Sequence, residues 1–243
     1  MKIIQSKIFS QFPEIKFGFS TKQGGVSPPP YYMNLSTNVG DSEENVKKNR
    51  EKFFGALGID IENITIQKQI HSTNLKYVST PGYVEDCDGL YTDKKNNFLV
   101  ISGADCITIF LYEPHKKVVA GVHSGWKGTN SKILTKAVQE LQRRFSIDVT
   151  ELMVYIGPSI SQDYYEVGEE VAELFEDDIK FFKIGKFHLD LKKNNIKQLL
   201  KLGVRINNIE DSGYCTYRDK DLFHSHRRDK GKTGRMFGVI GMV

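Results

Sequence analysis

The chain has 243 residues, of which 39% are hydrophobic and 26% are charged, and its formal net charge at pH 7 is +4. This composition is typical of a water-soluble globular protein. The charge is too small to favour nucleic acid as a partner. The longest apolar run, residues 98–112, is too short to cross a membrane and contains an acidic residue.

The first 20 residues contain no apolar segment of the kind found in export signals. Three cysteines, Cys87, Cys106 and Cys215, cannot all pair with one another. We therefore expect a reduced, cytoplasmic protein without a disulfide framework. No repeat, low-complexity tract or linker divides the chain, so residues 1–243 are expected to form a single domain.

Hydrophobic periodicity and turn residues predict the secondary structure in chain order. In the first part of the chain, the predicted elements are strands over 3–9 and 15–19, a long loop over 20–41, a helix over 43–57, a strand over 64–70 and a tight acidic turn over 86–93. In the middle, they are two buried strands within 98–112 broken near Gly103, a strand over 118–122, a glycine-bearing loop over 124–129, and a helix that follows an N-cap at Thr129 or Asn130 and reaches Phe145. In the last part, they are a strand over 152–156, helices over 167–175 and 189–202, a short strand over 214–217, a polar and basic loop over 223–229, and a strand over 236–242. Strands and helices do not alternate strictly, so the expected fold class is α+β, with a mixed β-sheet and flanking helices in layers.

Three residues that bind metal ions well are each predicted at the end of a buried strand: His71, Cys106 and His123. Side chains from separate strand ends can converge, and this set suits a borderline-soft cation such as Zn²⁺ while leaving a fourth position open. Zinc bound in this way would activate water or polarise a substrate. Asp105 and Asp88 are candidates for orienting a ligand imidazole or moving a proton.

The residues alone leave two other interpretations open. In the first, Cys106 is a metal-free nucleophile activated by His123 or His71. In the second, both histidines are satisfied structural groups and the cysteine packs as a small hydrophobic residue. The spacing is not a short local metal motif such as paired CxxC, so it does not decide among the three interpretations.

Ordered blocks along nearly the whole chain carry a family resemblance. They are GGVSPPPYYMNL, NVGDSEENVKKNR, KQIHS, DGLYTD, GADCITIFLY, AGVHSGWKGT, IGPSI, YEVGEEV and CTYRDKDLFHSHRRDKGKTGRM. These blocks resemble the YfiH/laccase-domain family, once described as multicopper polyphenol oxidases and now as purine nucleoside phosphorylases. The resemblance implies an α/β layered sandwich and a catalytic metal triad, which falls on His71, Cys106 and His123.

The activity implied by the resemblance is phosphorolysis of inosine, adenosine and methylthioadenosine, with adenosine deamination as a second activity. The implied partners are purine nucleosides and phosphate, and the implied cofactor is Zn²⁺, with Cu²⁺ as the other candidate metal. We expect a monomer or a weak homo-oligomer. The candidate substrate and phosphate contacts are Arg50, Lys127, Arg227, Arg228 and Asp88.

Two rival classes of protein remain. A multicopper polyphenol oxidase needs many histidine ligands, but the chain has six histidines, of which only His224 and His226 form an HxH pair. A single copper ion could still bind at the triad, because copper outcompetes zinc at such ligands. The second rival is a metal-binding partner protein without enzymatic activity.

Overall fold

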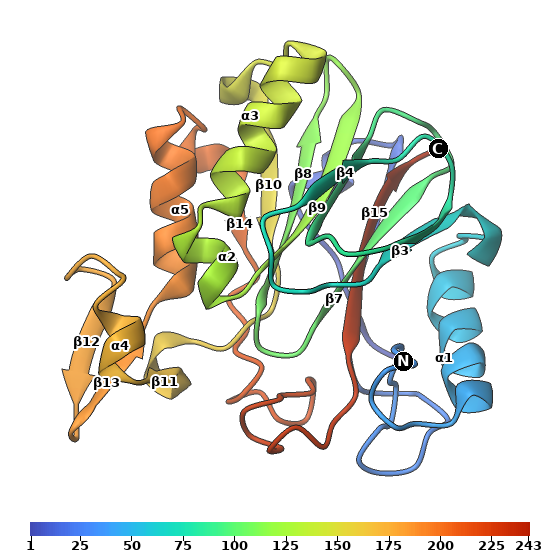
Figure 1. The fold of residues 1–243 in the computed structure, drawn as a ribbon. Helices are drawn as coiled ribbons and strands as arrows, with labels where there is room; N and C mark the ends of the chain where they lie inside the picture. Colours follow the sequence, from blue (N-terminus) through green and yellow to red (C-terminus); the bar gives the residue numbers. More distant parts are fainter.

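The computed structural model describes residues 1–243 as stacked layers of helices and sheets (Figure 1). The α-helices are α1 (Glu43–Ala56), α2 (Trp126–Asn130), α3 (Ile133–Phe145), α4 (Glu169–Ala172) and α5 (Leu191–Lys201). The strands are β1 (Ile3–Ile4), β2 (Ile15–Ser20), β3 (Ile64–Gln67), β4 (Leu75–Tyr77), β5 (Gly82–Val84), β6 (Gly89–Thr92), β7 (Phe98–Gly103), β8 (Ile107–Glu113), β9 (Val118–Ser124), β10 (Met153–Ile156), β11 (Glu166–Val167), β12 (Lys180–Lys183), β13 (Lys186–Leu189), β14 (Ile209–Asp211) and β15 (Met236–Met242).

Two mixed six-stranded sheets form the centre of the molecule. The first has the order β1-β2-β15-β7-β3-β5, and the second has the order β14-β10-β8-β9-β6-β4. Strand β3 runs parallel to both β5 and β7, whereas β8 and β9 form an antiparallel hairpin. A small antiparallel sheet, β11-β13-β12, lies to one side with α4 (Figure 1). The expected mixed sheet with flanking helices is therefore confirmed.

The two central sheets pack face to face because their middle strands are apolar on both sides. In β8, Ile109 and Leu111 belong to the core beneath the helices, whereas Phe110 and Tyr112 belong to the core between the sheets. This alternation follows from the two-residue period of a strand. Continuous apolar runs at 98–112 and 118–122 are thus the sequence signature of strands buried on both faces.

Helices cover the two outer faces of this pair of sheets. Helices α2, α3 and α5 lie on one side and α1 lies on the other (Figure 1). The apolar face of α3, including Leu134 and Val138, packs on the second sheet, and Phe53 and Phe54 of α1 pack against β7 and β15 of the first. None of the helices has the length and apolar character needed to span a bilayer.

Most predicted elements with a strong apolar pattern are confirmed: β2, α1, β7, β8, β9, β10, α5 and β15. In α5, Asp190 is the N-cap, and its side chain accepts the backbone N–H of Lys193 at 2.9 Å. The predicted strand over 3–9 is wrong beyond Ile4, because Phe9–Gln11 forms a 3₁₀ helix. The helix predicted over 167–175 is also wrong in length, and only the single turn of α4 forms.

Other predictions fail where side chains replace the expected backbone partners. The strand predicted over 64–70 ends at Gln67, because the N–H groups of residues 70–72 bond to the carboxylate of Asp88. The tight turn expected at 86–93 instead contains β6, which pairs with β4 and β9. Residues 214–217 make only an isolated bridge, Ser159 to Cys215.

The loop expected over 124–129 contains α2, and α3 begins three residues after that helix ends. Neither Thr129 nor Asn130 is the N-cap, because Lys132 occupies that position without a capping side-chain bond. The hydroxyl of Thr129 is instead within hydrogen-bond distance of Ser124 and Asn195. The same residues therefore join α2, β9 and α5.

Candidate active site

Three potential metal ligands meet at one end of the β8–β9 hairpin. Cys106 lies in the turn between β7 and β8, His123 lies near the end of β9, and His71 lies in the turn after β3. Their ligand atoms all lie within 4.8 Å of one another, and His71 Nε2 is 3.9 Å from Cys106 Sγ. His123 is buried, Cys106 is half-buried and His71 is exposed, so the cluster can be reached from one side.

The buried carboxylate of Asp88 positions both histidines. Its Oδ1 lies 2.9 Å from His123 Nδ1 and accepts the backbone N–H of His71 at 3.0 Å. Its Oδ2 accepts the backbone N–H and the hydroxyl of Ser72, at 2.6 and 2.8 Å. His71 has a positive φ of 59°, an uncommon conformation that these bonds stabilise. Because Nδ1 of His123 is engaged by Asp88, Nε2 is the nitrogen left for a ligand.

Gly125 provides the space in which the cluster forms. A Cβ atom at this position would lie 3.0 Å from Cys106 Sγ and 3.2 Å from a ring carbon of His71. Its φ of −74° and ψ of −178° are open to other residue types. The requirement for glycine is therefore one of space, and the sequence indicated it only as part of a glycine-bearing loop.

The local charges favour a thiolate at Cys106. Burial raises the pKa of its thiol, but the imidazoles of His123 and His71 outweigh burial and bring the pKa down to about 6. Burial lowers the pKa of His123, whereas the Cys106 thiolate and the Asp88 carboxylate raise it, with a net result of about 9. A metal ion binds the thiolate as it stands, and it would displace the proton of the His123 imidazole when it binds.

The donor set and its spacing fit a metal ion. At zinc–ligand bond lengths of about 2.0–2.3 Å, two ligands of a tetrahedral zinc lie roughly 3.3–3.8 Å apart. The separations in the cluster exceed this range by less than about 1 Å. The group His71, Cys106 and His123 can therefore hold a metal ion.

The cluster forms part of the wall of a cleft of about 560 Å³. Three arginines also line this cleft: Arg50, Arg227 and Arg235. None of them pairs with a carboxylate; their side-chain bonds go to backbone carbonyls of Leu35, Glu166, and Thr233 and Gly234, respectively. Burial lowers the pKa of Arg50, and it lowers the pKa of Arg235 although the Cys106 thiolate and the Asp105 carboxylate act in the opposite direction. Both cations are therefore partly stripped of water.

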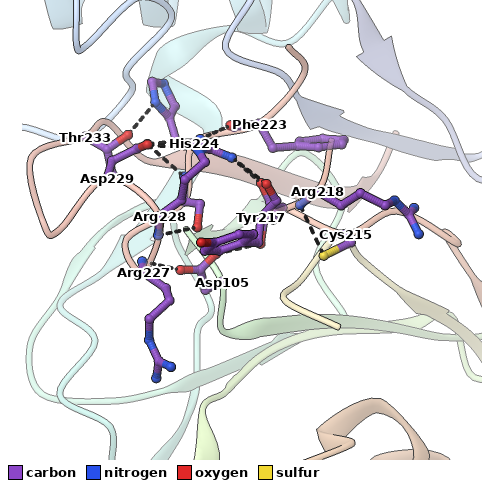
Figure 2. A network of polar contacts seen from close by, with 12 residues as sticks. Asp105, Cys215, Tyr217, Arg218, Phe223, His224, Arg227, Arg228, Asp229 and Thr233 are labelled. Atoms are coloured by element: carbon purple, nitrogen blue, oxygen red, sulfur yellow. Dashed lines mark hydrogen bonds and ion pairs between the residues drawn. The ribbon is translucent and has the colours of Figure 1, made fainter. Parts of the chain in front are cut away.

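Arg228 and Lys127 lie outside this cleft. The guanidinium of Arg228 donates to the carbonyls of Tyr217 and Phe223 and to the carboxylate of Asp229, as Figure 2 shows. It also donates to the carbonyl of Thr216. It therefore holds the C-terminal loop together. Lys127 is exposed on α2, with its ammonium over the ring of Trp126. Neither residue lines the cleft that contains the His–Cys–His cluster, and phosphate contact by Arg228 or Lys127 stays a prediction.

Asp105 lines the cleft but contacts no imidazole. Its carboxylate accepts the hydroxyl of Thr216 at 2.6 Å and the backbone N–H of Arg227 at 2.7 Å (Figure 2). Of the two predicted candidates for orienting a ligand histidine, Asp88 has this contact and Asp105 does not. Arg227 enters the cleft with its guanidinium carbon 5.2 Å from the ring centre of Tyr165.

Comparison with known proteins places the chain in a family. Residues 16–243 match the family model described as "Multi-copper polyphenol oxidoreductase laccase". Purine nucleoside phosphorylase YlmD of Bacillus subtilis is 34% identical, with coverage of 94% of this chain and 89% of that protein. A purine nucleoside phosphorylase of Clostridium acetobutylicum is 32% identical, with coverage of 99% and 98%. The chain belongs to the YfiH/laccase family.

Solved structures agree with this assignment. The crystal structure of YfiH from Bacillus licheniformis has a TM-score of 0.93 and 33% identity, and covers 99% of this chain and 96% of that one. The structure of YlmD from Geobacillus stearothermophilus has a TM-score of 0.91 and 32% identity, with coverage of 98% and 94%. The expected YfiH-like fold is thus confirmed.

Within this YfiH/laccase-family chain, some residues of the cleft were not predicted. Tyr165, His226 and Arg235 line it beside the expected residues. All three lie in the blocks that carry the family resemblance, and His226 also belongs to the HxH pair of the predicted polar loop. The HxH pair is divided: His226 faces the cleft, whereas His224 is buried with Nδ1 2.9 Å from the hydroxyl of Thr233.

Proposed function

We propose that this protein is a zinc-dependent purine nucleoside phosphorylase. Its substrates would be inosine, adenosine and methylthioadenosine together with inorganic phosphate, and adenosine deamination would be a second activity. The proposal rests on one observation above all. A His–Cys–His cluster and three arginines without carboxylate partners line the same cleft.

The three arginines of the cleft support the proposal that one substrate is an anion. A buried or half-buried guanidinium is costly unless it is paired, and a phosphate would supply the missing partner. Arg50 and Arg235 lie half-buried in the cleft, and Arg227 lies at its more exposed side. Planar guanidinium groups bind phosphate through paired N–H donors. We therefore assign phosphate to this arginine-lined part of the cleft.

The His–Cys–His cluster would hold the zinc. When bound there, zinc would polarise the purine or, for deamination, activate a water molecule. Asp88 would keep His123 in the tautomer with Nε2 free and would fix the backbone of His71. Gly125 would leave room for the three ligands. Arg50 and Arg235 would hold phosphate in position for attack.

In the proposed reaction, a phosphate oxygen forms a bond to C1′ of the ribose as the bond from C1′ to the purine nitrogen breaks. The bonding electrons leave with the purine, which takes up a proton. The products are the free base and ribose 1-phosphate, or methylthioribose 1-phosphate from methylthioadenosine. Positive charge develops on the ribose and negative charge on the departing purine. The bound phosphate would stabilise the first, and fixed polar or cationic groups beside the purine would stabilise the second.

Replacing each ligand tests this proposal. His71→Ala, Cys106→Ala and His123→Ala should each lose bound zinc and reduce phosphorolysis at least about a hundredfold. His115→Ala is the matched control, because His115 is an exposed histidine in the turn at the other end of the β8–β9 hairpin. Phosphorolysis by a metal-free Cys106→Ala protein would overturn the proposal.

A copper polyphenol oxidase is the competing candidate, because the family model carries that description. The chain offers one His/Cys group of three ligands, fewer than a blue and trinuclear copper set requires. An intense blue absorption band after full copper loading, together with oxidation of a phenol, would favour this candidate over phosphorolysis.

A further inference from the structure

Asp105 occupies a strained backbone position between a metal-ligand candidate and the arginine-bearing loop. It is 8% exposed and has a φ of +91°, a conformation that L-residues rarely adopt. Its backbone carbonyl accepts the N–H of Ile160 at 3.0 Å. Cys106 is the next residue in the chain. The conformation of Asp105 therefore influences where the Cys106 thiol lies.

The side chain of Asp105 joins this turn to the C-terminal loop, residues 215–233. One carboxylate oxygen accepts the Thr216 hydroxyl, and the other accepts the backbone N–H of Arg227. Figure 2 shows the Arg227 side chain extending away from this contact. Its guanidinium reaches the ring of Tyr165 and donates to the carbonyl of Glu166 at 2.7 Å. Arg228 bonds within the loop, and Thr216 and Leu222 of the loop bond to the backbone of Ser159 and Lys22.

Both oxygens of Asp105 already accept hydrogen bonds from the protein. Its partners are a hydroxyl and a backbone amide. A group that moves a proton during the reaction needs a free oxygen aimed at the substrate. The contacts of Asp105 instead match those of a residue that fixes a loop.

We propose that Asp105 is a positioning residue that sets the distance between the His–Cys–His cluster and the Arg227 guanidinium, so that phosphate held by Arg227 lies at a fixed separation from the metal site. This inference rests on the proposed function, because it assigns phosphate to Arg227. It goes further by giving Asp105 a role that acts through Arg227 and involves no proton transfer.

Two substitutions of Asp105 test whether this residue positions Arg227 or transfers a proton. Asp105→Asn keeps an acceptor for the Arg227 amide and tolerates positive φ, and its NH₂ group can donate to the Thr216 oxygen. Asp105→Gly removes the carboxylate, and glycine adopts the same φ without strain. Thr216→Val is the matched control, because it removes the other bond to the carboxylate and leaves the Arg227 contact in place.

The measurements are zinc content, binding of inorganic phosphate by calorimetry, and hydrogen exchange of the C-terminal loop. For Asp105→Gly we expect near wild-type zinc content, at least tenfold weaker phosphate binding and faster exchange near Arg227. Asp105→Asn and Thr216→Val should bind phosphate within about threefold of wild type. For turnover of inosine, Asp105→Gly should raise KM for phosphate more than it lowers kcat.

Three results would overturn the inference: wild-type phosphate affinity in Asp105→Gly, an equal loss in Asp105→Asn, or an equal loss in Thr216→Val. The second of these would show that Asp105 acts through its negative charge and not through the position of its hydrogen bonds. A wild-type protein that binds no phosphate would overturn the proposed function. Hydrogen exchange would still test whether Asp105 holds the C-terminal loop. Unchanged exchange of this loop in Asp105→Gly would contradict that role whether or not the protein has phosphorylase activity.

Discussion

Asp88 Oδ1 lies 2.9 Å from Nδ1 of His123, and both side chains are buried. The same carboxylate accepts the backbone N–H of His71. Hydrogen bonds from His123 and Ser72 keep its pKa below the usual range although burial acts in the opposite direction. One ionised group therefore fixes two of the three ligand candidates, which come from segments 52 residues apart in the sequence.

This relationship predicts the effect of Asp88→Asn. The amide would direct N–H donors toward groups that now donate to a carboxylate, so His123 and His71 should lose their alignment. Zinc affinity, measured by competition with a chelator, should fall about 10- to 100-fold. The control is Asp86→Asn, because Asp86 is an exposed neighbour whose ion pair is with Lys68. Unchanged zinc affinity in Asp88→Asn would show that Asp88 does not organise the ligands.

Gly125→Ala should damage the cluster without unfolding the protein. The new methyl would press on Cys106 Sγ and on the ring of His71, while the backbone conformation stays open to alanine. We expect at least tenfold weaker zinc binding and a small change in the melting temperature. Gly55→Ala is the control, since a Cβ on this residue of α1 meets nothing within 4 Å. That variant should bind zinc normally and gain about 0.5–1 kcal/mol in stability.

If the cleft arginines bind phosphate, their substitution should raise KM for phosphate, whereas substitution of a basic residue outside the cleft should not. Arg50→Gln and Arg235→Gln remove a charge from the cleft, so each should raise KM for phosphate at least tenfold, about 1.4 kcal/mol. Lys127→Gln should leave this KM unchanged, because Lys127 is exposed on α2 outside the cleft. A larger effect of Lys127→Gln than of the two arginine variants would place phosphate elsewhere.

Residue types and apolar runs predicted more of the fold than of the site. Ile107 to Glu113 and Val118 to Ser124 are strands because their apolar residues fill two cores at once. After β3, backbone N–H groups bond to the Asp88 carboxylate, and the local sequence pattern around β3 does not reveal this contact. For the same reason, the sequence named Asp105 and Asp88 as alternatives for the histidine contact. Only the folded chain shows which of them reaches an imidazole.

The polar and basic loop over 223–229 also shows that sequence alone does not reveal which side chains reach the cleft. Arg227 and Arg228 are adjacent, and nothing in their spacing distinguishes them. In the structure one guanidinium reaches the cleft, whereas the other bonds to three backbone carbonyls of its own loop. Arg235 reaches the cleft from beyond the predicted basic loop, because β15 begins directly after it.

In metal-free protein, the low pKa of the Cys106 thiol should give its alkylation rate an unusual pH dependence. Its pKa of about 6 means that the thiolate persists above that pH and is lost as the pH falls through it. The rate of alkylation by iodoacetamide should therefore be half-maximal near pH 6, whereas an ordinary thiol has its midpoint near about 8.5. Burial raises the pKa of Cys87 to about 11, and Cys215 is also buried. The alkylation at low pH should therefore disappear in Cys106→Ala. Zinc loading should protect the thiol, and sensitivity of turnover to alkylation after complete chelation would favour a metal-free cysteine nucleophile.

The most direct test of the central claim combines metal analysis with identification of products. The purified protein would be incubated with inosine, with and without inorganic phosphate, while its zinc content is measured. We predict near-stoichiometric zinc, with hypoxanthine and ribose 1-phosphate appearing only when phosphate is present. Stoichiometric zinc with no product under either condition would contradict the account and would indicate a metal-binding protein without this activity.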